Sequence, residues 1–284
     1  MIIVRIWEGL GNQMFQYAYA RFLSRKGQLV YLDLHKSYDA YFQRDKRQNN
    51  RNVAIQNFRI TIRGVDIEST NHYKYLKCKT LPERLIFKMA QRGKWIYNFW
   101  DEGYARDTDV FRGNCYVKGW FQNPAYLNNI RKILLKEFIP KKRIKITKQL
   151  RELLENHQTV SIHIRRGDYV AIHNALSWDY YAKAIAEMKK YYEDPVFIVF
   201  SDDYLWAKQH LNSDDVYYFI DEHECLEDYE QLMVMSRCNS NIIANSTFSW
   251  WAAWLNQNKD KNVIMPKRWL KNQEKLIMKE WVKL

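Results

Sequence analysis

TVSIHIRRGDY, residues 159–169, sets the pattern for the second half of this chain. Its first six residues are rich in β-branched side chains, which is typical of a short buried strand. Strand geometry puts His163 and Arg165 on one face and the two isoleucines behind them. Arg165 then emerges at the end of the strand, where ligands bind in open α/β sheets. A guanidinium there suits a phosphate, although an ion pair between Arg165 and Asp168 that fixes the turn is an equally good interpretation.

The same arrangement recurs along the chain, because other apolar runs are also followed by polar side chains. Strand patterns at residues 2–7, 196–200 and 242–244 are followed by Glu8, Asn12 and Gln13, by Asp202 and Asp203, and by Asn245, Ser246 and Thr247. The carboxyl ends of parallel strands lie along one edge of a sheet, so these clusters should converge. Each cluster alone fits ordinary turn and capping chemistry. Their repetition, with arginines among them, favours a site.

Helical spacing of apolar residues separates the strand patterns, for example at residues 13–25 and 178–192. Strand–helix alternation in both halves predicts an α/β protein with two doubly wound, Rossmann-like domains that face each other across a cleft. Pro140, followed by a run of lysines and arginines, is the best linker candidate. We therefore place the domains at residues 1–145 and 146–284.

Composition excludes a disordered chain, since 47% of the 284 residues are hydrophobic. The formal net charge of +13 implies phosphorylated or polyanionic partners or an anionic membrane surface, although solvated basic faces explain it equally simply. The four cysteines are widely spaced, which predicts neither a zinc site nor a disulfide framework and fits a reducing compartment. The first apolar run is too short for a signal peptide, and no stretch approaches the roughly 18 apolar residues of a membrane span. We expect a cytoplasmic protein, with peripheral contact at an anionic inner membrane face left open.

Two further motifs suggest different chemistry. Gly9-Leu-Gly11, with Asp33 about twenty residues further on, has the form of a dinucleotide-binding fingerprint, but Met14 at the third glycine position would crowd the helix against the strand. Asp107-Thr-Asp109 has the form that metal-dependent sugar transferases use to hold a divalent ion on a diphosphate. Patterns of three residues arise by chance, and no strand clearly precedes this one.

Four motifs occur in a characteristic order: GLGNQMFQYA at 9–18, HIRRGDY at 163–169, FSDD at 200–203 and IIANSTFSWWAAWL at 242–255. Together they resemble the α-1,2-fucosyltransferases of the bacterial and animal blood-group type. The resemblance covers nearly the whole chain and implies a two-domain GT-B fold. It also implies an inverting enzyme that moves L-fucose from GDP-β-L-fucose to the 2-hydroxyl of a galactose residue in a glycan, forming an α-1,2 linkage. It implies no cofactor and no metal, because cationic and hydrogen-bonding groups would neutralise the leaving GDP.

The resemblance also implies roles for individual residues. Arg165 would bind the β-phosphate, and Asp228 would read the guanine edge. The full donor-binding set is His163, Arg165, Asp202, Asp228, Asn245, Ser246 and Thr247. The set on the fucose and acceptor side is Gly11, Asn12 and Gln13.

The general base stays open. Relatives usually have glycine where this chain has Glu8, and a carboxylate there could deprotonate the attacking hydroxyl, although relatives work without it. Asp168 is the other candidate, and a loose, oxocarbenium-like transition state would need little assistance from a base. Arg165, Asp168 and Glu8 are therefore the candidate catalytic residues.

Two other functions are also considered. An NAD-dependent oxidoreductase that binds its cofactor through Gly9, Gly11 and Asp33 is one alternative, but it assigns no function to the region around Arg165. A basic module for nucleic acid or another polyanion is allowed by the aromatic residues near Arg44, but the regular α/β second half argues against it. The expected partners are GDP-fucose and a galactose-containing oligosaccharide, lipid-linked or soluble, with no nucleic acid.

Overall fold

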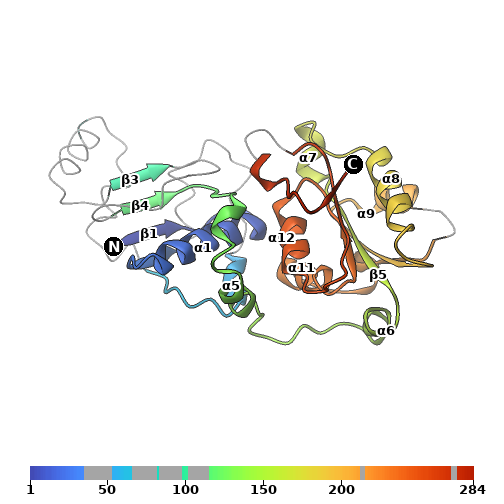
Figure 1. Ribbon diagram of the computed structural model, residues 1–284, viewed down its shortest axis with the longest axis horizontal. Helices are drawn as coiled ribbons and strands as arrows, with labels where there is room; N and C mark the ends of the chain where they lie inside the picture. The colour runs from blue at the N-terminus through green and yellow to red at the C-terminus, as the bar shows by residue number, and fades with distance from the viewer. Residues whose placement is uncertain (35–52, 66–81, 83–97, 102–114, 212–214, 270–273) are drawn as a thin grey trace. The chain divides into compact units, whose positions relative to one another are not determined.

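The computed structural model describes residues 1–34, 53–65, 82, 98–101, 115–211, 215–269 and 274–284. It divides into two compact units, Met1–Ile139 and Pro140–Leu284, here called unit 1 and unit 2 (Figure 1). The linker candidate Pro140 is thus the first residue of unit 2, a little before the expected boundary after residue 145. Each unit contains one sheet of parallel strands, so the predicted α/β class is confirmed. Asp107, Asp109 and the aromatic residues near Arg44 lie outside the described residues.

Unit 1 is built on a four-stranded sheet in the order β2-β1-β4-β3. The strands are β1 Ile2–Arg5, β2 Val30–Asp33, β3 Asn98–Asp101 and β4 Cys115–Lys118. The helical elements are α1 Leu10–Arg25, η3 Ala54–Asn57, η4 Pro124–Tyr126 and α5 Arg131–Glu137. Helix α1 begins at Leu10, directly after its cap Gly9, rather than near residue 13 as the sequence predicts. Gly11 therefore belongs to the helix and not to a turn.

Unit 2 is built on a six-stranded parallel sheet in the order β10-β9-β8-β5-β6-β7. The strands are β5 Thr159–Ile164, β6 Val196–Ser201, β7 Tyr217–Phe219, β8 Ser240–Ile242, β9 Val263–Met265 and β10 Val282–Lys283. The helices are α6 Lys148–Asn156, α7 Gly167–Ala171, α8 Trp178–Met188, α9 Tyr204–His210, α10 Ile220–His223, α11 Asp228–Met235, α12 Thr247–Leu255 and the short η5 Glu274–Leu276. Strand β5 has the predicted bounds, and every residue in it is buried.

The core of unit 2 forms where β5 pairs with both neighbours. Ile162 lies opposite Val199 of β6 and Ile242 of β8, and all three are buried. Tyr181 of α8 belongs to the same cluster. The tryptophans of α12 are buried too, as their helical spacing predicts. Burial on both faces of the sheet explains why its strands are almost continuously apolar.

In both sheets the strand order reverses beside the first strand of the unit. The chain leaves β5 for β6 and β7 on one side and later fills β8, β9 and β10 on the other. In unit 1, β2 lies on one side of β1 and β4 on the other. The crevice outside the carboxyl ends of the strands at such a point is where open α/β sheets bind ligands.

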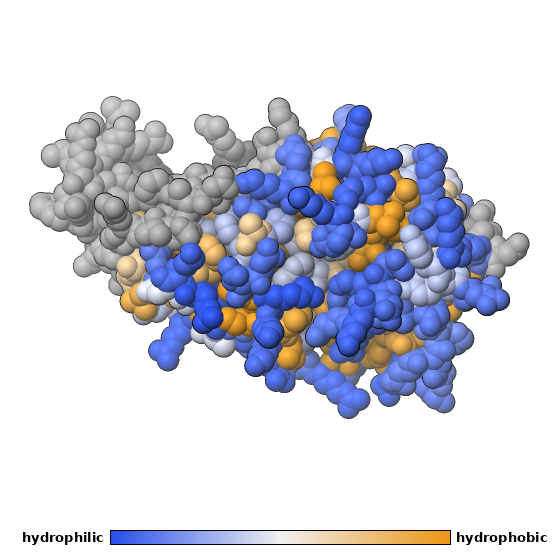
Figure 2. All heavy atoms as spheres, viewed as in Figure 1, coloured by the Kyte–Doolittle hydropathy of each residue, from blue (hydrophilic) through white to orange (hydrophobic). Residues whose placement is uncertain are grey.

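The surface of the described chain is mainly hydrophilic on the face drawn in Figure 2, where apolar residues form small groups between polar ones. Among the described residues, no helix combines the length and the apolar character needed to cross a bilayer.

Candidate active site

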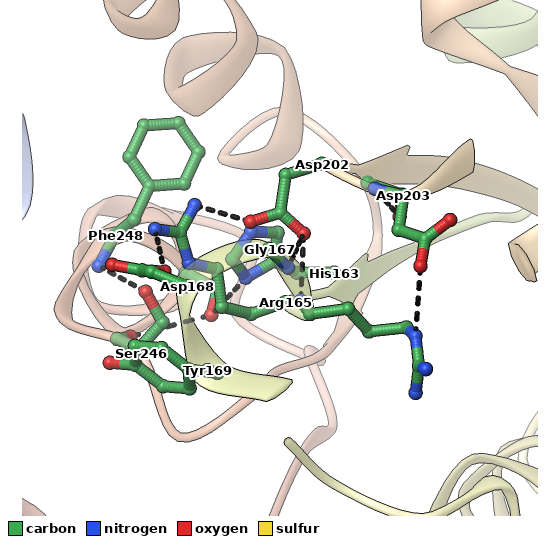
Figure 3. Close-up of polar contacts among 12 residues, drawn as sticks. His163, Arg165, Gly167, Asp168, Tyr169, Asp202, Asp203, Ser246 and Phe248 are labelled. Carbon is green, nitrogen blue, oxygen red and sulfur yellow. Dashed lines mark hydrogen bonds and ion pairs between the residues drawn. The ribbon is translucent and has the colours of Figure 1, made fainter. Parts of the chain in front are cut away.

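Three strand ends bring polar side chains together at the switch point of unit 2. Arg165 follows β5, Asp202 follows β6, and Ser246 follows β8 as the cap of α12. Figure 3 shows the Arg165 guanidinium beside Asp202 and Asp168, with Ser246 and Phe248 close to it. The expected convergence is therefore present for the clusters after β5, β6 and β8, whereas Glu8, Asn12 and Gln13 follow a strand of the other sheet, in unit 1.

Arg165 forms two ion pairs. Its Nη2 lies 2.5 Å from Asp168 Oδ1, and its Nη1 lies 2.5 Å from Asp202 Oδ2. The guanidinium carbon lies 5.4 Å from the centre of the Tyr169 ring. The arginine thus does fix the turn, as the simpler interpretation of the sequence proposed. A guanidinium has five N–H donors, however, so two carboxylates leave donors for a third acceptor such as a phosphate.

Asp202 is locked in place by the backbone of the turn. Its Oδ1 accepts hydrogen bonds from the backbone N–H of Arg166 at 2.7 Å and of Gly167 at 3.2 Å. A Cβ on Gly167 would lie 2.8 Å from Asp202 Oδ2, closer than real Cβ contacts come. Glycine is therefore needed here because the Asp202 carboxylate lies against the backbone. The carboxylate in turn orients Arg165.

The second arginine of the motif has a different task. Arg166 Nε lies 3.1 Å from Asp203 Oδ2, and its guanidinium carbon lies 4.0 Å from the centre of the Trp206 ring. Asp203 also caps α9 by accepting from the Trp206 backbone N–H at 3.2 Å. Arg166 therefore ties α9 to the turn, which leaves Arg165 as the arginine at the switch point.

The start of α12 supplies backbone donors beside Arg165. The Ser246 hydroxyl accepts from the Phe248 backbone N–H at 3.3 Å, and Thr247 is the first helical residue. Asn245 donates through Nδ2 to the Asn174 carbonyl at 2.9 Å, and its Oδ1 is buried with no hydrogen-bond partner. A helix N-terminus attracts anions, and a buried carbonyl oxygen requires a donor. The first feature suits a bound phosphate, and the second suits a hydroxyl group as donor.

His163 lies below this surface rather than on it. It is buried, its Nδ1 lies 2.9 Å from Ser249 Oγ, and its ring lies 5.5 Å from that of Phe248. Burial, assisted by the nearby charge of Arg165, lowers the pKa of His163 to about 3. The histidine is therefore neutral and supports the start of α12. A direct contact with a nucleotide, as expected from the sequence, would require it to be exposed.

Asp228, the expected reader of guanine, makes no direct contact with this cluster among the described residues. It is the first residue of α11, it is exposed, and the neighbouring Glu227 and Glu230 form a capping box. Within the described residues, no ion pair or side-chain hydrogen bond joins Asp228 to Arg165. The structure thus brings together Arg165, Asp168, Asp202 and Ser246, but not Asp228.

The switch point of unit 1 carries a second polar cluster. Glu8 Oε2 accepts hydrogen bonds from Asn12 Nδ2 at 2.5 Å and from Trp120 Nε1 at 2.6 Å. Asn12 Oδ1 accepts from Gln122 Nε2 at 2.8 Å. Sequence reasoning missed Trp120 and Gln122, which lie more than a hundred positions from their partners. Their place just after the apolar run of β4 is the one signal that could have found them.

Two residues expected on the acceptor side have structural tasks instead. Gly11 is buried in the first turn of α1. Gln13 is also buried: its Nε2 donates to the Glu8 carbonyl at 2.7 Å, and its Oε1 accepts from the Ile55 backbone N–H at 3.0 Å. Of the three expected residues, Asn12 alone is partly exposed.

The position of Asp33 argues against the alternative of a dinucleotide-binding site. This carboxylate is completely buried, where Oδ2 lies 2.9 Å from Arg5 Nη1 and accepts from the Tyr116 hydroxyl at 2.6 Å. It therefore cannot reach a ribose. Met14, at the third glycine position, is buried in α1.

The described part of the chain contains no group of three or more His, Cys, Asp or Glu side chains arranged to hold a metal ion. Asp107 and Asp109 are not among those residues, so the absence of a metal requirement stays a prediction.

Comparison with known proteins identifies the family. The model of glycosyl transferase family 11 matches residues 1–284. The O-antigen biosynthesis glycosyltransferase WbnK of Escherichia coli is 33% identical over 97% of this chain and 98% of that protein. An alpha-1,2-colitosyltransferase of Escherichia coli is 31% identical over 96% of this chain and 94% of that protein. The galactoside 2-alpha-L-fucosyltransferase Sec1 of Mus musculus is 29% identical over 90% of this chain and 64% of that protein.

Among solved structures, the fucosyltransferase NodZ from Bradyrhizobium overlaps with a TM-score of 0.49 at 14% identity, covering 89% of this chain and 92% of that chain. An overlap of this size supports no argument, and the fold rests on the two sheets described above. The resemblance inferred from the four motifs is confirmed by the family match over the whole chain. The chain belongs to glycosyl transferase family 11 and is a glycosyltransferase.

Proposed function

We propose that this glycosyltransferase moves L-fucose from GDP-β-L-fucose to the 2-hydroxyl of a galactose residue in a glycan, with inversion to an α-1,2 linkage. The observation that carries the proposal is Arg165, held by Asp202 at the switch point of the unit 2 sheet beside the start of α12. Relatives whose names specify alpha-1,2-colitosyl transfer and galactoside 2-alpha-L-fucosyl transfer support the linkage and the acceptor.

The donor diphosphate binds Arg165 by displacing one of its two carboxylates. The Asp168 side chain is 55% exposed, whereas that of Asp202 is 26% exposed and is held by two backbone N–H groups. The Asp168 carboxylate is therefore the one that leaves Arg165, and Asp202 continues to hold the guanidinium in its orientation. Ser246, Thr247 and the N-terminal end of α12 bind the other phosphate oxygens.

Arg165 also stabilises the leaving group. As the bond between the sugar and the β-phosphate breaks, negative charge grows on the phosphate oxygens while positive charge grows on the sugar ring. A fixed guanidinium and the N-terminus of α12 stabilise the first of these charges without a metal ion. The same arrangement holds GDP until the product has left.

A second candidate donor is GDP-colitose, because one relative is an alpha-1,2-colitosyltransferase. Colitose is fucose without its 3-hydroxyl. The two donors differ by that single hydroxyl, so a direct comparison of transfer from each decides between them.

The acceptor that fits the relatives best is a galactose-containing oligosaccharide of the O-antigen kind. The net charge of +13 suits work beside anionic lipid at the cytoplasmic membrane face, where such an acceptor could be lipid-linked.

The test is transfer from GDP-fucose, GDP-colitose and GDP-mannose, each offered with an array of galactose-terminated glycans. We expect fucose to be transferred, with an α-1,2 linkage and inverted configuration in the product as determined by NMR. GDP should raise the melting temperature, and NADH should not, since only a bound nucleotide stabilises the fold. Preferred transfer of colitose would replace the donor assignment. Failure of GDP to bind would overturn the proposal.

A further inference from the structure

The cluster at the switch point of unit 1 has no task in donor binding. It consists of Glu8, Asn12, Trp120 and Gln122, which three hydrogen bonds join across the loop after β1, helix α1 and the segment after β4. Glu8, Asn12 and Trp120 are each partly exposed. The Trp120 ring also lies 5.2 Å from the ring of Trp7. The cluster thus presents indole, amide and carboxylate groups at the ligand-binding edge of the sheet.

The backbone here is strained in two places. Glu8 has a φ of 66° and Phe121, between the two missed residues, has a φ of 50°. Both lie in the left-handed region, which is unfavourable for residues with a Cβ and persists where the surroundings enforce it. Glycine would adopt this conformation at position 8 without strain. Glutamate therefore occupies position 8 in spite of the backbone strain, which indicates that its side chain has a functional role.

Two buried polar atoms of the cluster lack partners. They are Trp7 Nε1, a donor, and Gln122 Oε1, an acceptor whose orientation is set because Nε2 donates to Asn12. A hydroxyl group is both a donor and an acceptor, so it can satisfy either atom, and the partly exposed Trp120 indole suits the C–H side of a pyranose. This combination points to a sugar as the ligand.

We infer that Glu8 is a positioning residue that orients the Trp120 indole and the Asn12 amide to bind the acceptor sugar, and that it is not the general base. The inference rests on the proposed function. Asn12 and Trp120 both donate to Oε2, so this oxygen of the carboxylate is committed to the two side chains and not to a substrate hydroxyl. The carboxylate instead fixes the directions of two side chains.

The two roles predict opposite behaviour for Glu8→Gln. A glutamine keeps a carbonyl oxygen that can accept both hydrogen bonds but cannot act as a base. We expect Glu8→Gln to retain transfer within about threefold and to keep the shape of the pH profile of kcat. Glu8→Gly, which relieves the left-handed strain and so should fold, is expected to raise KM for the acceptor about tenfold or more with a smaller change in kcat. Glu155→Gln, an exposed change in α6 with the same loss of charge, is the control.

Donor-only measurements separate this inference from the proposed function. Both Glu8 variants should bind GDP, because the cluster around Arg165 is not altered. A Glu8→Gln enzyme that loses as much kcat as Glu8→Gly, with the acidic limb of its pH profile gone, would identify a base and overturn the inference. Unchanged acceptor KM in Glu8→Gly would also overturn it. Absence of GDP binding in the unmodified enzyme would instead refute the proposed function.

Discussion

The switch points of the two units have the same topology but different chemistry. The cluster in unit 2 is charged, with two arginines against three aspartates: Arg165, Arg166, Asp168, Asp202 and Asp203. The cluster in unit 1 has one carboxylate, Glu8, surrounded by amide and indole N–H groups. A parallel sheet therefore supplies the place for a ligand, and the side chains at its strand ends select which ligand binds. Ion pairs suit a diphosphate, whereas neutral donors and aromatic faces suit a sugar.

The largest expected effect comes from removing Arg165. Arg165→Ala should lower kcat/KM about a thousandfold or more, and Arg165→Lys should lose most of the activity too, because an ammonium cannot reproduce the planar fork. The melting temperature should stay near that of the unmodified protein, and the shift caused by GDP should disappear. Arg151→Ala, an exposed change in α6, is the control. Normal turnover by Arg165→Ala would remove the distinction between the two clusters.

A smaller effect is expected from Gly167→Ala. The added Cβ would come within 2.8 Å of Asp202 Oδ2, so the carboxylate must move. The Arg165 guanidinium would then no longer be held in its present orientation. We expect about a tenfold loss of GDP affinity, measured by calorimetry. The KM for the acceptor should change little, since the cluster around Glu8 is untouched. Unchanged GDP affinity would show that Asp202 does not orient Arg165.

Acid should destabilise unit 2 through His163. Its pKa in the folded protein is about 3, below the ordinary 6.5, so the unfolded chain binds a proton that the folded chain does not. The stabilisation is complete above pH 6.5 and is lost as the pH falls from 6.5 towards 3, at up to about 1.4 kcal/mol per pH unit. Denaturant unfolding at pH 7.5 and pH 5.5 should reveal this difference. His163→Gln should make the difference smaller, and an equal difference in both proteins would contradict the assignment.

The smallest expected effect is that of a chelator. If Arg165 and the start of α12 stabilise the leaving GDP, transfer should continue unchanged in excess EDTA. The assay should compare the initial rate with and without added Mn²⁺. Strict dependence on Mn²⁺ would revive Asp107 and Asp109 as a metal site and would weaken the case for an ionic cluster that acts alone.

Much of unit 2 followed from patterns within short stretches. The β-branched residues predicted β5 with its observed bounds, and the helical spacing of tryptophans predicted the buried face of α12. One expectation failed because a glycine takes its role from its surroundings: Gly11 was expected in a turn but is helical. The burial of His163 beside Phe248 and Ser249 was not apparent from the sequence, because it depends on contacts with residues more than 80 positions away.

The alternation of strands and helices and the polar residues that follow the strands could be predicted from the amino-acid sequence, because periodicity and motif spacing are local properties. The partners of those residues were not. Asp202 meets Arg165 across a strand pair, and Trp120 meets Glu8 from 112 positions away. Such pairings depend on how strands order themselves in a sheet, which is decided by long-range packing. For that reason the folded structure alone distinguishes the ionic cluster around Arg165 in unit 2 from the amide and indole groups around Glu8 in unit 1.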